Sequence, residues 1–316
     1  MKLRLALLLG LLPGACSFQA AVPHPHYVLG AAYQADGVWH YPRRRLDLVA
    51  TGLATVIPAG HPALTADGEA FEQDALAAAS PDLQLPAIAR LTDLANGRQI
   101  EVRINDRGPA DPARLVAVTR RVARALGLPG GGVAPVRLHV LAGPSQVAEA
   151  ALPGAPLLAL TAAPVRAVLA TSLGAPGGGA AAVSGRVVSG PAGSVSALPG
   201  GVRAAAPAGA PGPGGAPSGA IVPALSGQVA QTPPRYGALW VRLIRFSQYQ
   251  DAARLAARLA GLHPAIRREM ANGEEHFTVR IGPFGFGAAG VAAADATLRQ
   301  AIGAGVNDAR IVVEPE

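Results

Sequence analysis

The stretch QIEVRINDRGP (residues 99–109) says most about how this chain folds. Polar and apolar residues alternate over 99–104, as they do in a strand that buries one face, and the Asp-Arg-Gly-Pro end favours a turn. A second alternating segment, APVRLHVL (134–141), follows one plausible helix, VTRRVARALGL (118–128). Short strands, frequent turns and few helices predict a small, mainly β barrel over residues 27–142.

A second ordered region is expected over residues 236–316. LWVRLIRF (239–246) alternates like a strand, and SQYQDAARLAARLAGL (247–262) has the apolar spacing of an amphipathic helix. Two more strands, a helix and a last strand are predicted over 264–313. The order β-α-β-β-α-β predicts an α+β domain of the split βαβ type, with one sheet and two helices on one of its faces.

Between these regions, residues 143–235 have the composition of a linker. Up to Pro234 they contain no aromatic residue, and no acidic residue follows Glu149. Ala, Gly, Pro, Ser and Val dominate, and such a segment cannot bury enough apolar surface to offset the entropy lost on ordering. We therefore expect a disordered linker over this whole range.

The first sixteen residues have the pattern of an export signal. Basic residues at positions 2 and 4 precede an apolar run over 5–12, which is too short to span a membrane, and PGAC (13–16) follows. The cysteine after small residues resembles a lipobox, although Pro13 stands where that motif usually has leucine. We expect Cys16 to be lipidated, residues 17–26 to form a tether, and Ser17 to favour the outer membrane.

The net charge of +7 and the sequence pI of about 10.4 leave two explanations open. The charge could attract an anionic partner such as a cell-wall polymer, or the arginine content could reflect a GC-rich genome. Because the arginines are scattered along the chain, we do not expect a nucleic-acid groove. The histidines have no metal-ligand spacing, so no metal site and no cofactor are expected.

Three stretches together resemble the RlpA (rare lipoprotein A) family: YVLGAAYQADGVWHYPR (27–43), TADGEAF (65–71) and VRINDRGP (102–109). The terminal region, with VRIGPF (279–284), is similar to a SPOR domain. The resemblance implies a double-psi β-barrel and a periplasmic, outer-membrane lipoprotein. It also implies a lytic transglycosylase that cuts peptide-free (denuded) peptidoglycan strands at the division septum, forms 1,6-anhydro-muramyl ends, and has division proteins as further partners.

The resemblance assigns the catalytic acids to Glu69, in the TADGE turn, and to Asp106, in NDRGP. Arg107 and Ser80 are the expected sugar-binding residues of the barrel. A solvated turn acid at Glu69 and a turn-capping acid at Asp106 are the ordinary alternatives. One carboxyl can serve as acid and then as base, because this cleavage consumes no water.

The predicted site is incomplete in three places. The family has a histidine eleven residues after the glutamate, where this chain has Ser80, and an aspartate where it has Ala117. ATVIP (54–58) replaces ASWYG, which removes two aromatic residues. His61 lies close to the Glu69 turn and could supply the missing imidazole, or could be an ordinary loop histidine.

Other candidate sugar contacts also have two interpretations. Arg242 and Arg280 could bind glycan from the exposed face of the SPOR-like sheet, or could be ordinary surface charges. Trp39 and Tyr41 are expected mainly to pack, with sugar stacking as the alternative. We therefore predict a weak lytic transglycosylase. The alternatives are a non-catalytic lipoprotein that tethers denuded glycan through its SPOR domain, and an expansin-like protein that loosens glycan without cutting it.

Overall fold

The computed structural model of the chain describes residues 21–129, 132–156, 225–235, 237–271 and 273–315. The predicted export signal, the Cys16 lipidation site and the central part of the predicted linker lie outside the described residues. In the described parts of the chain, no helix is both long and apolar enough to cross a membrane.

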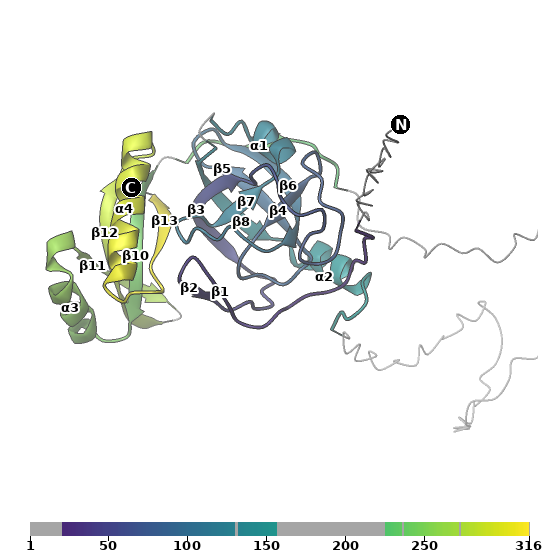
Figure 1. The fold of residues 1–316 in the computed structure, drawn as a ribbon. Helices are drawn as coiled ribbons and strands as arrows, with labels where there is room; N and C mark the ends of the chain where they lie inside the picture. The colour runs from purple at the N-terminus through teal and green to yellow at the C-terminus, as the bar shows by residue number, and fades with distance from the viewer. Residues whose placement is uncertain (1–20, 130–131, 157–224, 236, 272, 316) are drawn as a thin grey trace, which may run out of the picture. The chain divides into compact units, whose positions relative to one another are not determined.

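The N-terminal region is a closed β-barrel, as the sequence predicts (Figure 1). Six strands form the ring in the order β4-β7-β3-β8-β5-β6, and β6 pairs with β4 to close it. The β3–β7 and β4–β6 pairs are parallel and the other pairs of the ring are antiparallel. The elements of this region are β1 (Tyr33–Ala35), β2 (Val38–His40), β3 (Val49–Val56), β4 (Ala77–Ala79), β5 (Ala87–Asp93), β6 (Arg98–Asp106), β7 (Val116–Val118), α1 (Arg120–Leu126), β8 (Ala134–Val140), α2 (Ala142–Ala150) and β9 (Ala230–Gln231).

Strand β6 shows why the barrel forms and where it departs from simple alternation. Ile100, Val102 and Ile104 point into the apolar core, as their spacing predicts. Arg103 and Asn105, on the opposite side of the strand, are nevertheless buried. The cause is the turn at residues 65–69, whose Asp67 amide donates to the Asn105 carbonyl and which covers the outer face of β6. Because both faces of β6 are buried, the polar side chains of Arg103 and Asn105 are enclosed between the strand and the 65–69 turn.

Both described ends of the predicted linker make specific contacts with the barrel. In α2, which begins where the linker was expected to begin, the buried Ser145 hydroxyl accepts from the Ile88 amide at 2.9 Å and donates to its carbonyl at 3.1 Å. At the other end, β9 pairs with β6, and the Thr232 amide donates to the Gly97 carbonyl. A Cβ at residue 97 would lie 1.8 Å from the Thr232 carbonyl oxygen, so only glycine permits this approach.

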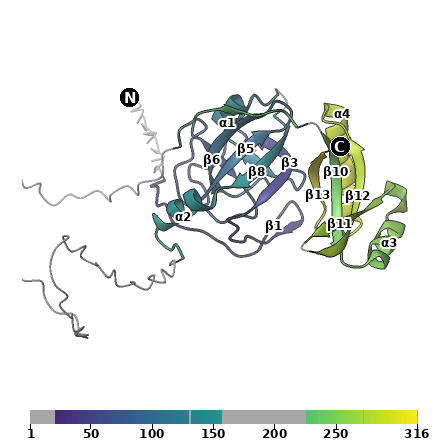
Figure 2. The same cartoon turned by 180° about the vertical axis from the view of Figure 1, so that it is seen from behind.

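The C-terminal region has the predicted β-α-β-β-α-β order (Figures 1 and 2). Its elements are β10 (Gly237–Phe246), α3 (Tyr249–Arg258), the 3₁₀ turn η1 (Ala260–Leu262), β11 (Ala265–Ala271), β12 (Glu274–Phe284), α4 (Ala288–Gly303) and β13 (Arg310–Pro315). The antiparallel sheet has the order β11-β12-β10-β13. Leu239 and Val241 of β10 share one apolar core with Leu255 of α3 and Leu298 of α4, so both helices cover the same face of the sheet.

Candidate active site

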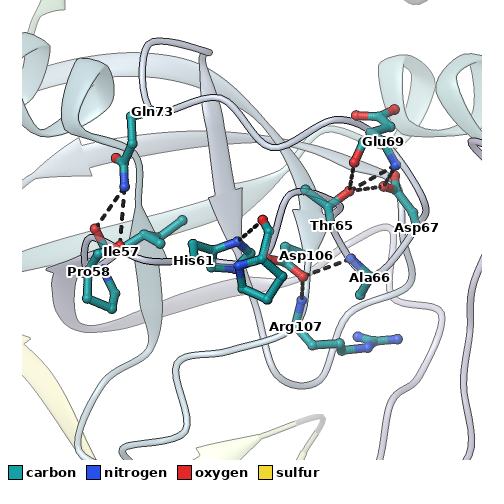
Figure 3. A network of polar contacts seen from close by, with 11 residues as sticks. Ile57, Pro58, His61, Thr65, Ala66, Asp67, Glu69, Gln73, Asp106 and Arg107 are labelled. Atoms are coloured by element: carbon teal, nitrogen blue, oxygen red, sulfur yellow. Dashed lines mark hydrogen bonds and ion pairs between the residues drawn. The ribbon is translucent and has the colours of Figure 1, made fainter. Parts of the chain in front are cut away.

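Asp106 stands at the last position of β6, and its carboxyl group is almost completely buried. Its Oδ1 atom accepts hydrogen bonds from the backbone amides of Ala66 and Arg107, each at 2.8 Å (Figure 3). The Asp106 carbonyl accepts from the Ser80 amide at 3.0 Å. The Thr65–Glu69 turn and the end of β4 therefore hold this carboxyl in one orientation.

His61, from the loop after β3, faces the other oxygen of Asp106 (Figure 3). Its Nε2 atom is 2.7 Å from Asp106 Oδ2, and its Nδ1 atom is 3.0 Å from the Pro62 carbonyl oxygen. The two atoms are in close contact without the alignment of a hydrogen bond, and Oδ2 has no hydrogen-bond partner among the described residues. Phe71 packs against the imidazole with ring centroids 4.0 Å apart.

These contacts determine how protons can be arranged on His61 and Asp106. A carbonyl oxygen only accepts hydrogen bonds, so Nδ1 carries a hydrogen toward Pro62. Nε2 and Oδ2 are close enough for a proton on one of these atoms to be passed to the other. A carboxyl and an imidazole in contact are the residue types that general acid–base chemistry uses.

Both carboxylate oxygens of Glu69 already accept hydrogen bonds from protein side chains. Its Oε1 atom accepts from Arg103 Nε at 2.8 Å and pairs with the same guanidinium through Nη2, and its Oε2 atom accepts from Asn105 Nδ2 at 2.8 Å. Arg103 and Asn105 lie on the same side of β6, whereas Asp106 is the next residue along the strand. In Figure 3 the Glu69 carboxylate points away from Asp106. The two predicted acids are thus joined by the 65–69 turn but do not face each other.

Asp67 is an acidic site residue that the sequence did not single out. It is fully buried; its Oδ1 atom accepts from the Thr65 hydroxyl at 2.7 Å and from the Glu69 amide at 3.3 Å, and its Oδ2 atom has no partner among the described residues. Burial, followed by the negative charge of Glu69, raises the pKa of Asp67 from 3.8 to about 6. No signal in TADGE distinguishes such a buried acid from an exposed turn residue.

The positions at which the sequence departs from the family lie beside this pair. In the barrel, Ala79 is paired with both Asp106 and Ala117. Ala79, Ala117, Ile57 and Phe71 form a small apolar cluster. Ser80 is buried. The site therefore has an apolar wall at Ala117, and the imidazole in contact with Asp106 is that of His61.

The guanidinium of Arg107, which the sequence predicts to bind sugar, already donates hydrogen bonds to backbone carbonyls of the protein. The Arg107 guanidinium donates to the carbonyls of Leu29, Pro81 and Leu83, and burial lowers its pKa. This arrangement supports the 81–83 segment and leaves little of Arg107 for a ligand.

In the C-terminal domain, Arg280 lies over the Trp240 ring, 3.7 Å from its centroid, and pairs with Glu314. Burial lowers the pKa of Arg242, with Arg310 and Arg245 adding to the effect. The sugar-binding roles of Arg242 and Arg280 stay predictions. Among the described residues, no group of three or more His, Cys, Asp or Glu side chains is arranged to hold a metal ion.

Comparison with known proteins supports the two-domain reading. Residues 49–138 match the family model described as lytic transglycolase, and residues 236–307 match the SPOR domain model. These matches confirm the resemblance of the two regions to an RlpA-type barrel and a SPOR domain.

Several curated relatives carry the name endolytic peptidoglycan transglycosylase RlpA. The protein of Escherichia coli K12 is 55% identical over 60 residues, which cover 19% of this chain and 17% of the relative. The Campylobacter jejuni protein is 36% identical over 111 residues, 34% of this chain and 40% of the relative. The Rickettsia bellii protein is 30% identical over 120 residues, 37% of this chain and 53% of the relative. The matches thus span between about a sixth and a half of these relatives.

Proposed function

We propose that this chain, with a barrel similar to lytic transglycosylases and a SPOR domain, cleaves the glycan strands of peptidoglycan. The observation that carries the proposal is the His61–Asp106 pair, in which a fixed carboxyl and an imidazole lie 2.7 Å apart. The names of the relatives supply the reaction type, and the pair supplies groups that can perform it.

The cleavage needs one proton to be moved twice. The pair first donates its proton to the oxygen that joins N-acetylmuramic acid to N-acetylglucosamine, and the C1–O bond breaks. The 6-hydroxyl of the muramyl sugar then attacks C1, and its proton returns to the pair. The products are a 1,6-anhydro-muramyl end and a free sugar end, and no water is consumed. Asp106 orients His61 and balances its positive charge while the imidazole is protonated.

Glu69 has a positioning role in this proposal. Its carboxylate neutralises the buried Arg103 and holds Asn105, and its backbone closes the turn that presents the Ala66 amide to Asp106. Removal of the Glu69 charge should therefore disturb the geometry around Asp106 rather than remove a reacting group.

The finer parts of the proposal concern place and substrate. A SPOR domain next to a transglycosylase-like barrel suits a periplasmic cell-wall protein. We further propose that the substrate is peptide-free glycan at the septum, and that Cys16 anchors the chain to the outer membrane and brings it near division proteins.

A non-catalytic wall tether is the second candidate. It is favoured by the replacement of a family histidine and aspartate with Ser80 and Ala117, and by the complete engagement of Glu69 with Arg103 and Asn105. In that case the SPOR domain would hold the chain on denuded glycan and the barrel would not cleave the glycan.

Digestion of amidase-treated sacculi separates the two candidates. The purified chain should release products with 1,6-anhydro-muramyl ends, detected by liquid chromatography and mass spectrometry. Asp106→Asn should slow their formation about 100-fold or more, since it removes an acid–base group. If the E. coli RlpA protein forms these ends in a parallel reaction and this chain does not, the tether is the correct function.

A further inference from the structure

One surface of the barrel domain carries large aromatic side chains that the protein does not bury. Trp39 is 52% exposed and Tyr41 is 55% exposed. They alternate with Val38 and His40, which are buried. Trp39 lies in β2, and the next exposed residues at alternate positions are Tyr41 and Arg43, the latter in a β-bridge with Leu83. Four extended residues span about 13 Å. We call these three residues the 39–43 stripe. The expectation that Trp39 and Tyr41 mainly pack is wrong, because Val38 and His40 take the inward positions.

The stripe is held on a rigid backbone. His40 stacks on Tyr33, with centroids 5.2 Å apart, and lies 3.2 Å from Asp82. The Arg43 amide donates to the Asp82 carbonyl at 2.9 Å, and the Tyr33 hydroxyl donates to the Pro81 carbonyl at 3.1 Å. Such a fixed surface can bind a ligand without paying much entropy to order itself.

The same segment connects the stripe to the candidate active site. Residues 81–83 accept the hydrogen bonds that hold the stripe, and they also accept from Arg107, which directly follows Asp106. Ser80, the residue before this segment, bonds to the Asp106 carbonyl. A polymer bound to the stripe would thus be bound to the segment that borders the reacting groups.

The chemistry of the stripe suits an anionic sugar polymer. The C–H face of a pyranose ring is weakly positive and apolar, and it packs well on the negative face of an aromatic ring. Among the described residues, Arg43 forms no ion pair. When the peptide is removed from peptidoglycan, each muramyl sugar regains a free lactyl carboxylate, which an arginine can bind by two parallel hydrogen bonds.

We propose that Trp39, Tyr41 and Arg43 form a subsite for peptide-free glycan, with the aromatic rings stacked on sugars and Arg43 paired with a lactyl carboxylate. This inference rests on the proposed function and adds to it a means by which the barrel itself recognises glycan that has lost its peptides. It is separate from any glycan binding by the SPOR domain.

The test uses the fluorescence of Trp39 in the full chain. The protein contains two tryptophans, so Trp240→Phe leaves Trp39 as the only one and keeps a ring beneath Arg280. Peptide-free glycan strands from amidase-treated sacculi should protect Trp39 from acrylamide quenching. Fully N-acetylated chito-oligosaccharide, which has similar sugars but no charge, should need about three times the concentration, the difference that one exposed ion pair supplies.

Two variants in the Trp240→Phe background show which residues act. Tyr41→Ala should weaken protection by both sugars about three- to tenfold. With Arg43→Gln, the two sugars should protect Trp39 at equal concentrations, because the ion pair is lost and the aromatic stacking is kept. Tyr249→Ala, which removes an equally exposed aromatic ring from α3, is the matched control and should change nothing.

The proposal is overturned if glycan leaves Trp39 quenching unchanged while a pull-down shows the chain bound to it, since the glycan would then be bound at another part of the chain. It is also overturned if both sugars protect equally in the unmodified stripe. The quenching experiment needs no turnover. Protection of Trp39 without anhydro products would refute the cleavage alone, and cleavage without protection would refute the subsite alone.

Discussion

Asp67→Asn is the change whose effect follows most directly from the structure. The folded protein raises the pKa of this buried carboxyl from 3.8 to about 6, with burial as the main cause. Below about pH 3 the group is mostly protonated in both the folded and the unfolded chain. Between pH 4 and 6 the folded chain retains its proton longer, so the free energy of unfolding falls as the pH rises.

The size of this loss comes from the two pKa values. A shift of about 2 units corresponds to about 3 kcal/mol, at 1.36 kcal/mol per unit. Asparagine resembles the protonated acid and does not titrate. Its amide has no partner where Asp67 Oδ2 lies, which costs about 1–3 kcal/mol at every pH. The stability difference between Asp67→Asn and the parent should therefore move in favour of the variant by about 2 kcal/mol between pH 4 and 7, since part of the loss already occurs below pH 4.

Urea unfolding at pH 4, 5, 6 and 7 measures this difference. Fluorescence of Trp39 in a Trp240→Phe background reports on the barrel alone. Asp74→Asn is the control, because the Asp74 side chain is 79% exposed and its removal should give a nearly constant difference. A constant difference for Asp67→Asn would refute the reasoning, since it would mean that the folded chain does not bury this carboxyl unpaired.

Two further predictions concern the turn that supports Asp106 and the end of the predicted linker. Glu69→Gln should destabilise the barrel by about 3 kcal/mol because it leaves the buried Arg103 without its charge partner. Glu101→Gln, which breaks an exposed pair with Arg90, is the control and should cost less than about 1 kcal/mol. Equal losses of stability in thermal denaturation would contradict the importance of the buried pair. Gly97→Ala should release β9, seen as faster hydrogen exchange at residues 230–232, because its Cβ would collide with the Thr232 carbonyl. Gly37→Ala is the control, because φ is +76° at Gly37 and +78° at Gly97, but a Cβ at residue 37 meets no neighbour. It should leave the exchange at residues 230–232 unchanged. Exchange that is equally slow in both variants would show that β9 does not pack on Gly97.

The sequence predicted the two folded regions well because their strands and helices have clear periodicity. QIEVRI alternates and becomes β6, and the apolar spacing of residues 247–262 becomes α3. The contacts of α2 and β9 were not predictable in the same way. They depend on one hydroxyl, that of Ser145, and on a close approach to Gly97, and neither changes the Ala- and Gly-rich composition that indicated a linker.

The candidate site was predictable only in part. The resemblance located Glu69 and Asp106, but the partners of each depend on tertiary structure. His61 lies 45 residues before Asp106, and no spacing rule links a loop histidine to the end of a distant strand. Likewise, the ion pair of Glu69 with Arg103 forms only because the 65–69 turn covers the outer face of β6.

Chemical rescue of His61→Ala is the most direct test of the account. This change removes the imidazole and leaves a space beside Phe71 and Asp106. With amidase-treated sacculi, formation of anhydro-muramyl ends should fall about 100-fold, and added imidazole should restore part of it in His61→Ala but none in Asp106→Asn. Full activity of His61→Ala without imidazole would contradict the mechanism in which the His61–Asp106 pair transfers the proton.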